Sequence, residues 1–208
     1  MILSKMVSAM VMVVICSLIP VIWWAITARK KENFFQWIGL YMPKLKMKWW
    51  SLIIFLVIYY LYWTFDLTML MDPESMANAQ SSGTLADSEY AGMGFAAVLP
   101  MLIQTFVANG LSEEILFRGF MCKRFQSKFG KKLGFILQAC CFGLMHNLLY
   151  LAAGMDVSLQ FHLAIFAYTG GGALLLGFLN EKMCNGSIIP SVLLHGLGNF
   201  LGMIGDAF

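Results

Sequence analysis

Three ionisable residues occur within residues 112–118, where the surrounding sequence is otherwise largely apolar. An unpaired charge in the hydrocarbon of a membrane costs about 2.5 kcal/mol or more on insertion scales. On a helix, Glu114 and Arg118 stand four residues apart with the acid first, which is the favourable order for an ion pair. Glu113 points about 100° away around the helix and lacks that partner. We therefore predict that Glu114 and Arg118 form a structural pair and that Glu113 is available for chemistry.

Two later apolar stretches also contain polar residues at helical spacing. His146 follows Phe142 by one helical turn, and Phe142 is expected to pack and shape a pocket. His195 and Asn199 share one helix face because they are four residues apart. Each pair also has a simpler explanation: a carbonyl could satisfy His146, and His195 with Asn199 could join two membrane helices.

The depths of these residues favour chemistry over the simpler explanations. If the helices before and after Gly130 form an antiparallel hairpin, Glu113 and His146 lie level, because both are nearly equally far from Gly130 in sequence. Helix geometry places them, and His195 too, about 12 Å inside the membrane at about 1.5 Å per residue. The sequence therefore predicts that three separate segments bring polar groups to one level.

A carboxylate and an imidazole in a cavity of low dielectric constant can exchange a proton, as general acid–base catalysis requires. We predict that Glu113 and His146 activate a water molecule that attacks a carbonyl. His195 and Asn199 would then donate hydrogen bonds to the oxyanion. No serine, cysteine or threonine beside a base offers itself as a nucleophile, which favours direct attack by water and hydrolysis of a peptide bond.

The composition indicates what must position these groups. Of 208 residues, 60% are hydrophobic and 12% charged, against about 25% charged in a typical soluble domain. The long apolar runs predict an all-α, polytopic integral membrane protein with about six transmembrane helices. The expected spans are 6–28, 49–71, 93 to the 113–118 stretch, 133–151, 159–179 and 188–203. Basic residues flank these spans instead of gathering on one face, so nucleic-acid binding has no support.

Charge asymmetry predicts the orientation in the cell membrane. Residues 29–48 and 121–132 are rich in lysine and arginine, whereas residues 72–92 carry only acidic charges. The positive-inside rule places the two basic segments in the cytoplasm and both termini outside. Residues 1–92 are then two N-terminal transmembrane helices with a basic cytoplasmic loop and an acidic outer loop. Residues 93–208 form a catalytic core of four helices.

Three motifs together resemble those of the CPBP intramembrane proteases, which include CAAX prenyl proteases and bacteriocin-processing, Abi-type relatives. The motifs are Glu113-Glu114-xxx-Arg118, Phe142-xxx-His146 and His195-xxx-Asn199, and the resemblance covers residues 93–208. It implies a helical membrane enzyme that cleaves peptide bonds near the cytoplasmic side. It also implies the catalytic roles given above, with Glu114 and Arg118 supporting the site. The expected substrate is a small peptide, such as a bacteriocin or secreted signal, or a membrane protein of a bacterial plasma membrane.

Two alternatives remain open at this point. Glu113, His146 and His195 could be ligands of a zinc ion that leaves one position open for water, although the resemblance favours a metal-free glutamate mechanism. The protein could also be a non-catalytic immunity or scaffold factor that binds a peptide or partner in the same cavity.

Overall fold

The computed structural model describes residues 1–81 and 89–208 and is all-α within them. Within these described residues, four helices are long and apolar enough to cross a membrane: Ile2–Thr27, Gly94–Phe129, Lys131–Ala152 and Leu159–Met183. Two shorter apolar helices lie beside them, Trp49–Trp63 and Ile189–Gly205. The predicted all-α, multi-pass class is confirmed, with four of the six expected spans at full membrane length.

The labelled helical segments follow one another without any β-strand in the described ranges. In chain order they are α1 (Ile2–Thr27), α2 (Phe34–Ile38), α3 (Trp49–Trp63), η1 (Leu67–Leu70), α4 (Pro73–Ser81), η3 (Gly94–Ala97), α5 (Val98–Leu102), η4 (Ile103–Leu111), α6 (Ser112–Glu114), η5 (Ile115–Cys122), α7 (Lys123–Phe129), α8 (Lys131–Ala152), α9 (Leu159–Phe178), η6 (Leu179–Met183) and α10 (Ile189–Ala207). The segments from η3 to α7 run without a break and form one central helix, residues 94–129.

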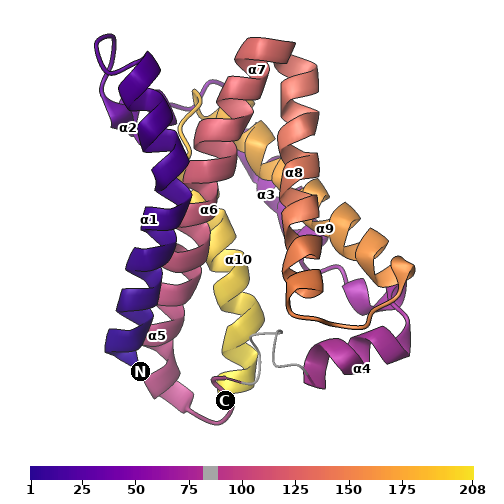
Figure 1. The fold of residues 1–208 in the computed structure, drawn as a ribbon. Helices are drawn as coiled ribbons and strands as arrows, with labels where there is room; N and C mark the ends of the chain where they lie inside the picture. Colours follow the sequence, from indigo (N-terminus) through magenta and orange to yellow (C-terminus); the bar gives the residue numbers. More distant parts are fainter. Residues whose placement is uncertain (82–88) are drawn as a thin grey trace.

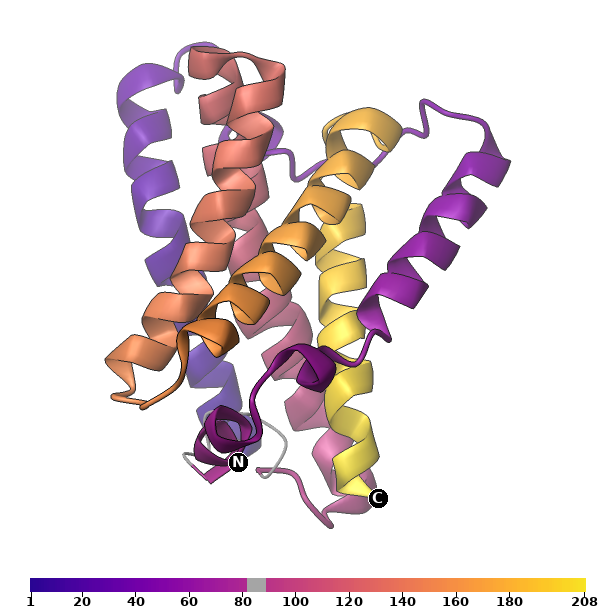
Figure 2. The ribbon, with the colours of Figure 1, turned by 90° about the vertical axis from the view of Figure 1, so that its right-hand side faces the viewer.

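The central helix is packed between α1 and α10 (Figure 1). α8 packs against α7 and η5 of the central helix, α9 packs against α8, and α3 lies beside α9 and α10 (Figure 2). Both termini lie at one end of the bundle, whereas α2 and the α7–α8 turn lie at the opposite end (Figure 1). The latter is called the basic end here, because residues 29–48 and 121–132 form it.

The outer surface of the bundle is largely apolar, and several polar side chains are buried among the apolar residues of its interior. Only Ala9, Cys16 and Pro20 of α1 are buried, so most of this apolar helix faces outward, as lipid contact requires. Polar side chains are buried in the interior instead, and those of the membrane-spanning part include Thr105, Ser112, Glu114, Arg118, Gln138, Asn180 and Ser191. Polar groups at membrane depth face a bundle interior when they have a function there.

The predicted second span, 49–71, is wrong beyond Trp63, where α3 ends. The side chain of Asp66 accepts hydrogen bonds from Thr68 N at 3.0 Å and Thr68 Oγ1 at 2.6 Å. A short acidic side chain that binds nearby backbone competes with helix formation, and the chain turns into η1 and α4. Residues 82–88 of the predicted acidic outer loop lie outside the described residues.

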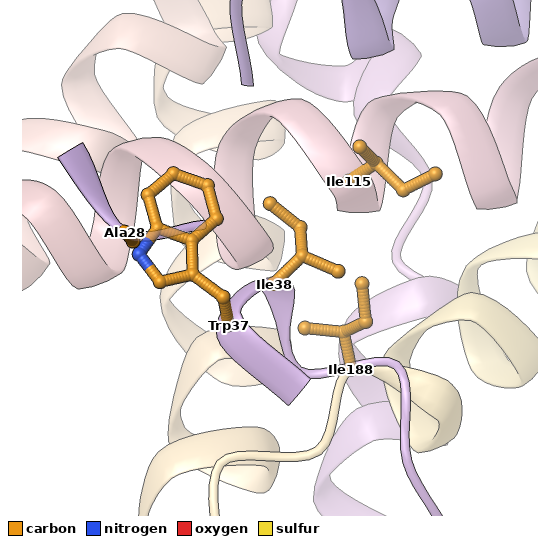
Figure 3. Packing of buried hydrophobic residues seen from close by; sticks show 5 residues of the cluster. All are labelled: Ala28, Trp37, Ile38, Ile115 and Ile188. Carbon is orange, nitrogen blue, oxygen red and sulfur yellow. The ribbon is translucent and has the colours of Figure 1, made fainter. Parts of the chain in front are cut away.

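The short helix α2 is docked into the protein at the basic end. Trp37 and Ile38 are 5% and 0% exposed and pack with Ala28, Ile115 and Ile188, as Figure 3 shows. Ile115 follows Glu114 in the central helix, and Ile188 directly precedes α10. The cluster therefore ties the basic loop to two segments that lead directly into the polar interior.

The expected hairpin turn at Gly130 is confirmed. Gly130 has φ +85°, a conformation that glycine adopts without strain, and it is the single residue between α7 and α8. Four residues later, Gly134 lies so close to α7 that a Cβ atom there would overlap the backbone of Phe125 and Gln126. Gly134 therefore allows α8 to approach α7.

A methyl group at position 134 is expected to separate the two arms of this hairpin. Overpacking of this kind typically costs about 1–3 kcal/mol, so Gly134→Ala should lower the midpoint of thermal unfolding in detergent. Gly205→Ala is the matched control, because a Cβ there meets nothing within 4 Å. Equal midpoints for the two variants would contradict this account of the hairpin.

Candidate active site

The two adjacent glutamates lie where the central helix changes its winding. α6 is a single turn of α-helix between two π-helical segments, η4 and η5. In η4 the hydrogen bonds reach five residues back, as from Ser112 N–H to the carbonyl of Val107. Such wide turns are rare and occur frequently at functional sites. The sequence predicted an ordinary helix here, and no local residue pattern distinguishes the two.

Glu114 is fully buried, and its carboxylate has three polar partners. Arg118 Nη1 lies 3.1 Å from Oε1 and Arg118 is 2% exposed, so the predicted ion pair is confirmed. Ser191 Oγ donates to Oε2 at 2.5 Å, and Nδ1 of His195 lies 3.1 Å from Oε1. Glu114 is therefore more than a structural partner of Arg118, because it also holds a predicted site histidine.

His195 lies between the two glutamates. Because a carboxylate only accepts hydrogen bonds, the contact with Glu114 places a proton on Nδ1. The other nitrogen, Nε2, lies 3.9 Å from Oε2 of Glu113. That oxygen is buried and has no hydrogen-bond partner among the described residues. Glu113 thus retains a free acceptor beside the imidazole, as its separation from Arg118 in the sequence predicted.

His146 approaches the same region from α8. Its Nδ1 lies 2.9 Å from the carbonyl oxygen of Phe142, so Nδ1–H donates and Nε2 is left as an acceptor. The Phe142 ring lies between the polar groups: its centroid is 4.6 Å from the His146 ring and 6.1 Å from the His195 ring. The Arg118 guanidinium lies over the same ring at 4.1 Å. Phe142 thus shapes the site, as predicted.

A cavity of about 130 Å³ opens at this point. Its wall includes His146, His195, Asn199, Arg118 and Phe142, together with Tyr59, Tyr62, Trp63, Tyr168, Thr169, Gly172 and Leu176. At about 30 Å³ for each molecule, the volume suits roughly four waters. The two predicted imidazoles and Asn199 therefore line one cavity that has room for several water molecules.

Glu113 stands at the edge of this arrangement. It does not contribute to the cavity wall, and no hydrogen bond or ion pair joins it to His146 within the described ranges. The structure brings Glu113 to His195 and brings His146 to Phe142. A water molecule would have to bridge Glu113 and His146 for both to act on it.

The zinc alternative has no matching set of ligands. Among the residues that the structure describes, no group of three or more His, Cys, Asp or Glu side chains could hold a metal ion. Glu113, His146 and His195 do not converge as tetrahedral coordination would require, with ligands about 2.0–2.2 Å from the metal.

Two buried residues of the site were not predicted from the sequence. Ser191 precedes His195 by one turn on the same helix face, and this spacing was a usable signal. Asn180 lies in the π-helical segment η6, and its Nδ2 donates to Ser191 Oγ at 2.7 Å. A single asparagine at the end of an apolar run carries no such signal.

The buried pair gives a direct test of this geometry. Removing one partner of a buried ion pair typically costs about 3–5 kcal/mol, because the other charge is left unpaired. Arg118→Met should therefore strongly lower the unfolding midpoint in detergent. The double variant Glu114→Gln with Arg118→Met should recover much of the loss, since it leaves no unpaired charge.

The half-exposed pair of Lys5 and Glu89 provides the control. Glu89→Gln removes a contact of 2.6 Å in which the glutamate is 49% exposed, and such pairs are typically worth about 0–1 kcal/mol. A loss from Arg118→Met no larger than that from Glu89→Gln would contradict the buried pair.

Comparison with known proteins identifies the family of this chain. No curated protein and no solved structure matches the chain. Residues 95–201, about half of the chain, match a protein family, the type II CAAX prenyl endopeptidase Rce1-like family. The matched range contains all three motifs and every residue of the predicted site. The resemblance expected from the motifs is confirmed, and the chain belongs to the type II CAAX prenyl endopeptidase Rce1-like family.

Proposed function

We propose that this protein is an intramembrane endopeptidase that hydrolyses a peptide bond of a small peptide or membrane-associated protein. The observation that carries the proposal is the placement of His195. Glu114 holds one nitrogen of its ring, Glu113 lies beside the other, and the ring borders the cavity of about 130 Å³ that is shared with His146 and Asn199. A structural histidine would need neither the second carboxylate nor the cavity.

The roles follow from which atoms are free. Nε2 of His146 and Oε2 of Glu113 are acceptors, so they can take a proton from water. Asn199 offers amide N–H groups to an oxyanion. Nδ1 of His195 is occupied by Glu114, so only Nε2 can face the substrate. Donation from Nε2 requires the doubly protonated ring, whose charge the two neighbouring carboxylates would balance.

The reaction then balances without a protein nucleophile. Water loses a proton to Glu113 and His146, and its oxygen bonds to the carbonyl carbon of the substrate. The carbonyl oxygen becomes an oxyanion held by His195 and Asn199. When the intermediate collapses, the C–N bond breaks and the leaving amine takes up the proton. The products are a carboxylic acid and a free amine, and the proton that remains on the acid then passes to the amine to give a carboxylate and an ammonium group.

Replacing either proton acceptor, Glu113 or His146, should strongly lower turnover without unfolding the protein. A general base contributes about 10²- to 10⁴-fold, so Glu113→Gln and His146→Gln should each lower kcat by about that factor. The first assay uses purified protein in proteoliposomes with quenched fluorogenic CAAX peptides, both prenylated and unprenylated. The second compares the peptides and the membrane-protein termini of cells with and without active Glu113. His162→Gln is the control, because His162 bonds Asn147 outside the cavity.

The outcomes separate the alternatives. If Glu113→Gln is expressed normally and cells that carry it keep the full biological effect, the result contradicts catalysis and favours the non-catalytic immunity or scaffold function. If a chelator abolishes the activity and zinc restores it, the result contradicts the metal-free glutamate mechanism and favours the zinc mechanism. The peptides that accumulate without Glu113 identify the substrate, so cleavage of the prenylated peptide alone would exclude a bacteriocin or secreted signal as the main substrate.

Six membrane spans and a cytoplasmic basic end also form part of this proposal. Residues 1–92 supply two spans and residues 93–208 the catalytic core of four. The basic segments 29–48 and 121–132 lie at one end of the bundle, opposite both termini (Figure 1), as the positive-inside rule requires of a cytoplasmic face. The site lies in the bundle interior, and cleavage would occur near that face of a bacterial plasma membrane.

Cysteines introduced at exposed positions test this orientation. Lys30→Cys and Lys132→Cys should react with a membrane-impermeant maleimide only in inverted vesicles, whereas Glu89→Cys should react in intact cells. The native cysteines serve as the background measured in the unsubstituted protein. Reaction of position 132 and position 89 from the same side would overturn the orientation.

A further inference from the structure

The three partners of the Glu114 carboxylate hold it in different ways. The contact of Arg118 Nη1 with Oε1 is an ion pair, since Nη1 makes no hydrogen bond in the described part of the chain. Ser191 Oγ instead donates a hydrogen bond to Oε2 at 2.5 Å. A charge contact tolerates rotation of the carboxylate, whereas a short, charge-assisted hydrogen bond is directional. The Ser191 hydroxyl therefore sets the direction in which Oε1 faces His195.

Asn180 lies behind Ser191 and fixes the polarity of this contact. A hydroxyl has one proton to donate, and two acceptors compete for it: Glu114 Oε2 at 2.5 Å and the Ile188 carbonyl at 2.9 Å. Nδ2 of Asn180 donates to Ser191 Oγ at 2.7 Å, so it occupies a lone pair of the hydroxyl. Because Glu114 only accepts, one polarity satisfies the chain: Asn180 donates to Ser191, and Ser191 donates to Glu114.

Stability alone does not account for the asparagine. Its amide oxygen is buried and lacks a hydrogen-bond partner among the described residues. An unpaired buried acceptor typically costs about 1–3 kcal/mol, and leucine, which has a similar size, would avoid that cost. What Asn180 contributes is the N–H that it directs at Ser191.

We propose that Ser191 and Asn180 are positioning residues that hold Glu114 and, through it, fix the ring orientation of His195 and keep the proton on its Nδ1. The inference rests on the proposed function, because it assigns these residues a role in the same hydrolytic site. The chain of contacts joins three elements: η6 after α9, α10, and α6 of the central helix. Carboxylates that orient a functional histidine are typically worth about 10- to 100-fold in activity or affinity.

The experiment compares Ser191→Ala and Asn180→Leu with matched buried controls. Ser187→Ala removes a fully buried hydroxyl that donates to the Tyr41 carbonyl at 2.6 Å, away from Glu114. Gln138→Leu removes a buried amide whose oxygen also lacks a partner among the described residues and whose Nε2 donates to the Ala173 carbonyl at 3.3 Å. Each control thus changes the same chemical group without touching the contacts of Glu114.

Two readouts are measured on the full-length protein in micelles or proteoliposomes. The first is the ¹⁵N spectrum of the histidine rings. The chain has three histidines, so His195→Gln assigns the His195 signals. The second is kcat and KM for the fluorogenic CAAX peptides used above.

Ser191→Ala should shift the His195 ¹⁵N signals, because Glu114 no longer holds Nδ1–H in one direction, and lower kcat by about 10- to 100-fold. Asn180→Leu should shift the same signals and lower kcat less, because Ser191 still donates to Glu114. KM should stay within about threefold, and the unfolding midpoint of Asn180→Leu should match or exceed that of the wild type. Ser187→Ala and Gln138→Leu should leave the His195 signals in place.

Unchanged His195 signals in Ser191→Ala would overturn the inference, even if kcat falls, since the effect would then not pass through His195. Shifted signals with kcat no lower than in the controls would overturn it too, because the orientation would not matter for turnover. If the wild type cleaves none of the peptides and Ser191→Ala still shifts the His195 signals, the positioning stands and the proposed peptidase function fails.

Discussion

A carboxylate that is completely buried inside a membrane-spanning bundle constrains the rest of this structure. Moving a charge out of water costs several kcal/mol even after relaxation, so Glu114 is tolerable only if other groups surround it with donors and opposite charge. Arg118 supplies the charge from the same helix, and Ser191 and His195 supply donors from α10. The central helix and α10 must therefore pack at one particular register.

The residues around the contact between the central helix and α10 support the same packing. The glycines at 110 and 196 allow close approach, since a Cβ at Gly110 would lie 3.1 Å from the Val192 carbonyl. On the other side, Ile38 of α2 packs against Ile115 and Ile188, the residues that flank the polar contacts at the basic end (Figure 3). This apolar cluster thus lies between the charged interior and the basic loop. This separation matters because hydrogen bonds and charge contacts strengthen where water is excluded.

The sequence predicted the class of the fold and some of its contacts for physical reasons that act locally. Apolar runs reveal membrane helices, and residues four apart on a helix meet, which is why the Glu114–Arg118 pair and the turn at Gly130 were predictable. The end of α3 at Trp63 was missed because the capping by Asp66 competes with an apolar pattern that continues beyond it. The contact of Glu114 with His195, and the role of Asn180, depend on π-helical winding and on packing between distant segments. No spacing rule within a single helix contains that information.

The shortness of α3 has a consequence for the bilayer itself. Its 15 residues span about 22 Å at about 1.5 Å per residue, whereas the hydrocarbon layer is about 30 Å thick. Lipids beside a helix this short thin locally, or its flanking residues reach towards the headgroups. Tyr59 and Trp63 of this helix form part of the wall of the cavity that His146 and His195 also line. The hydrophobic mismatch thus lies beside this cavity, where it shortens the path for water between the membrane surface and the buried polar groups.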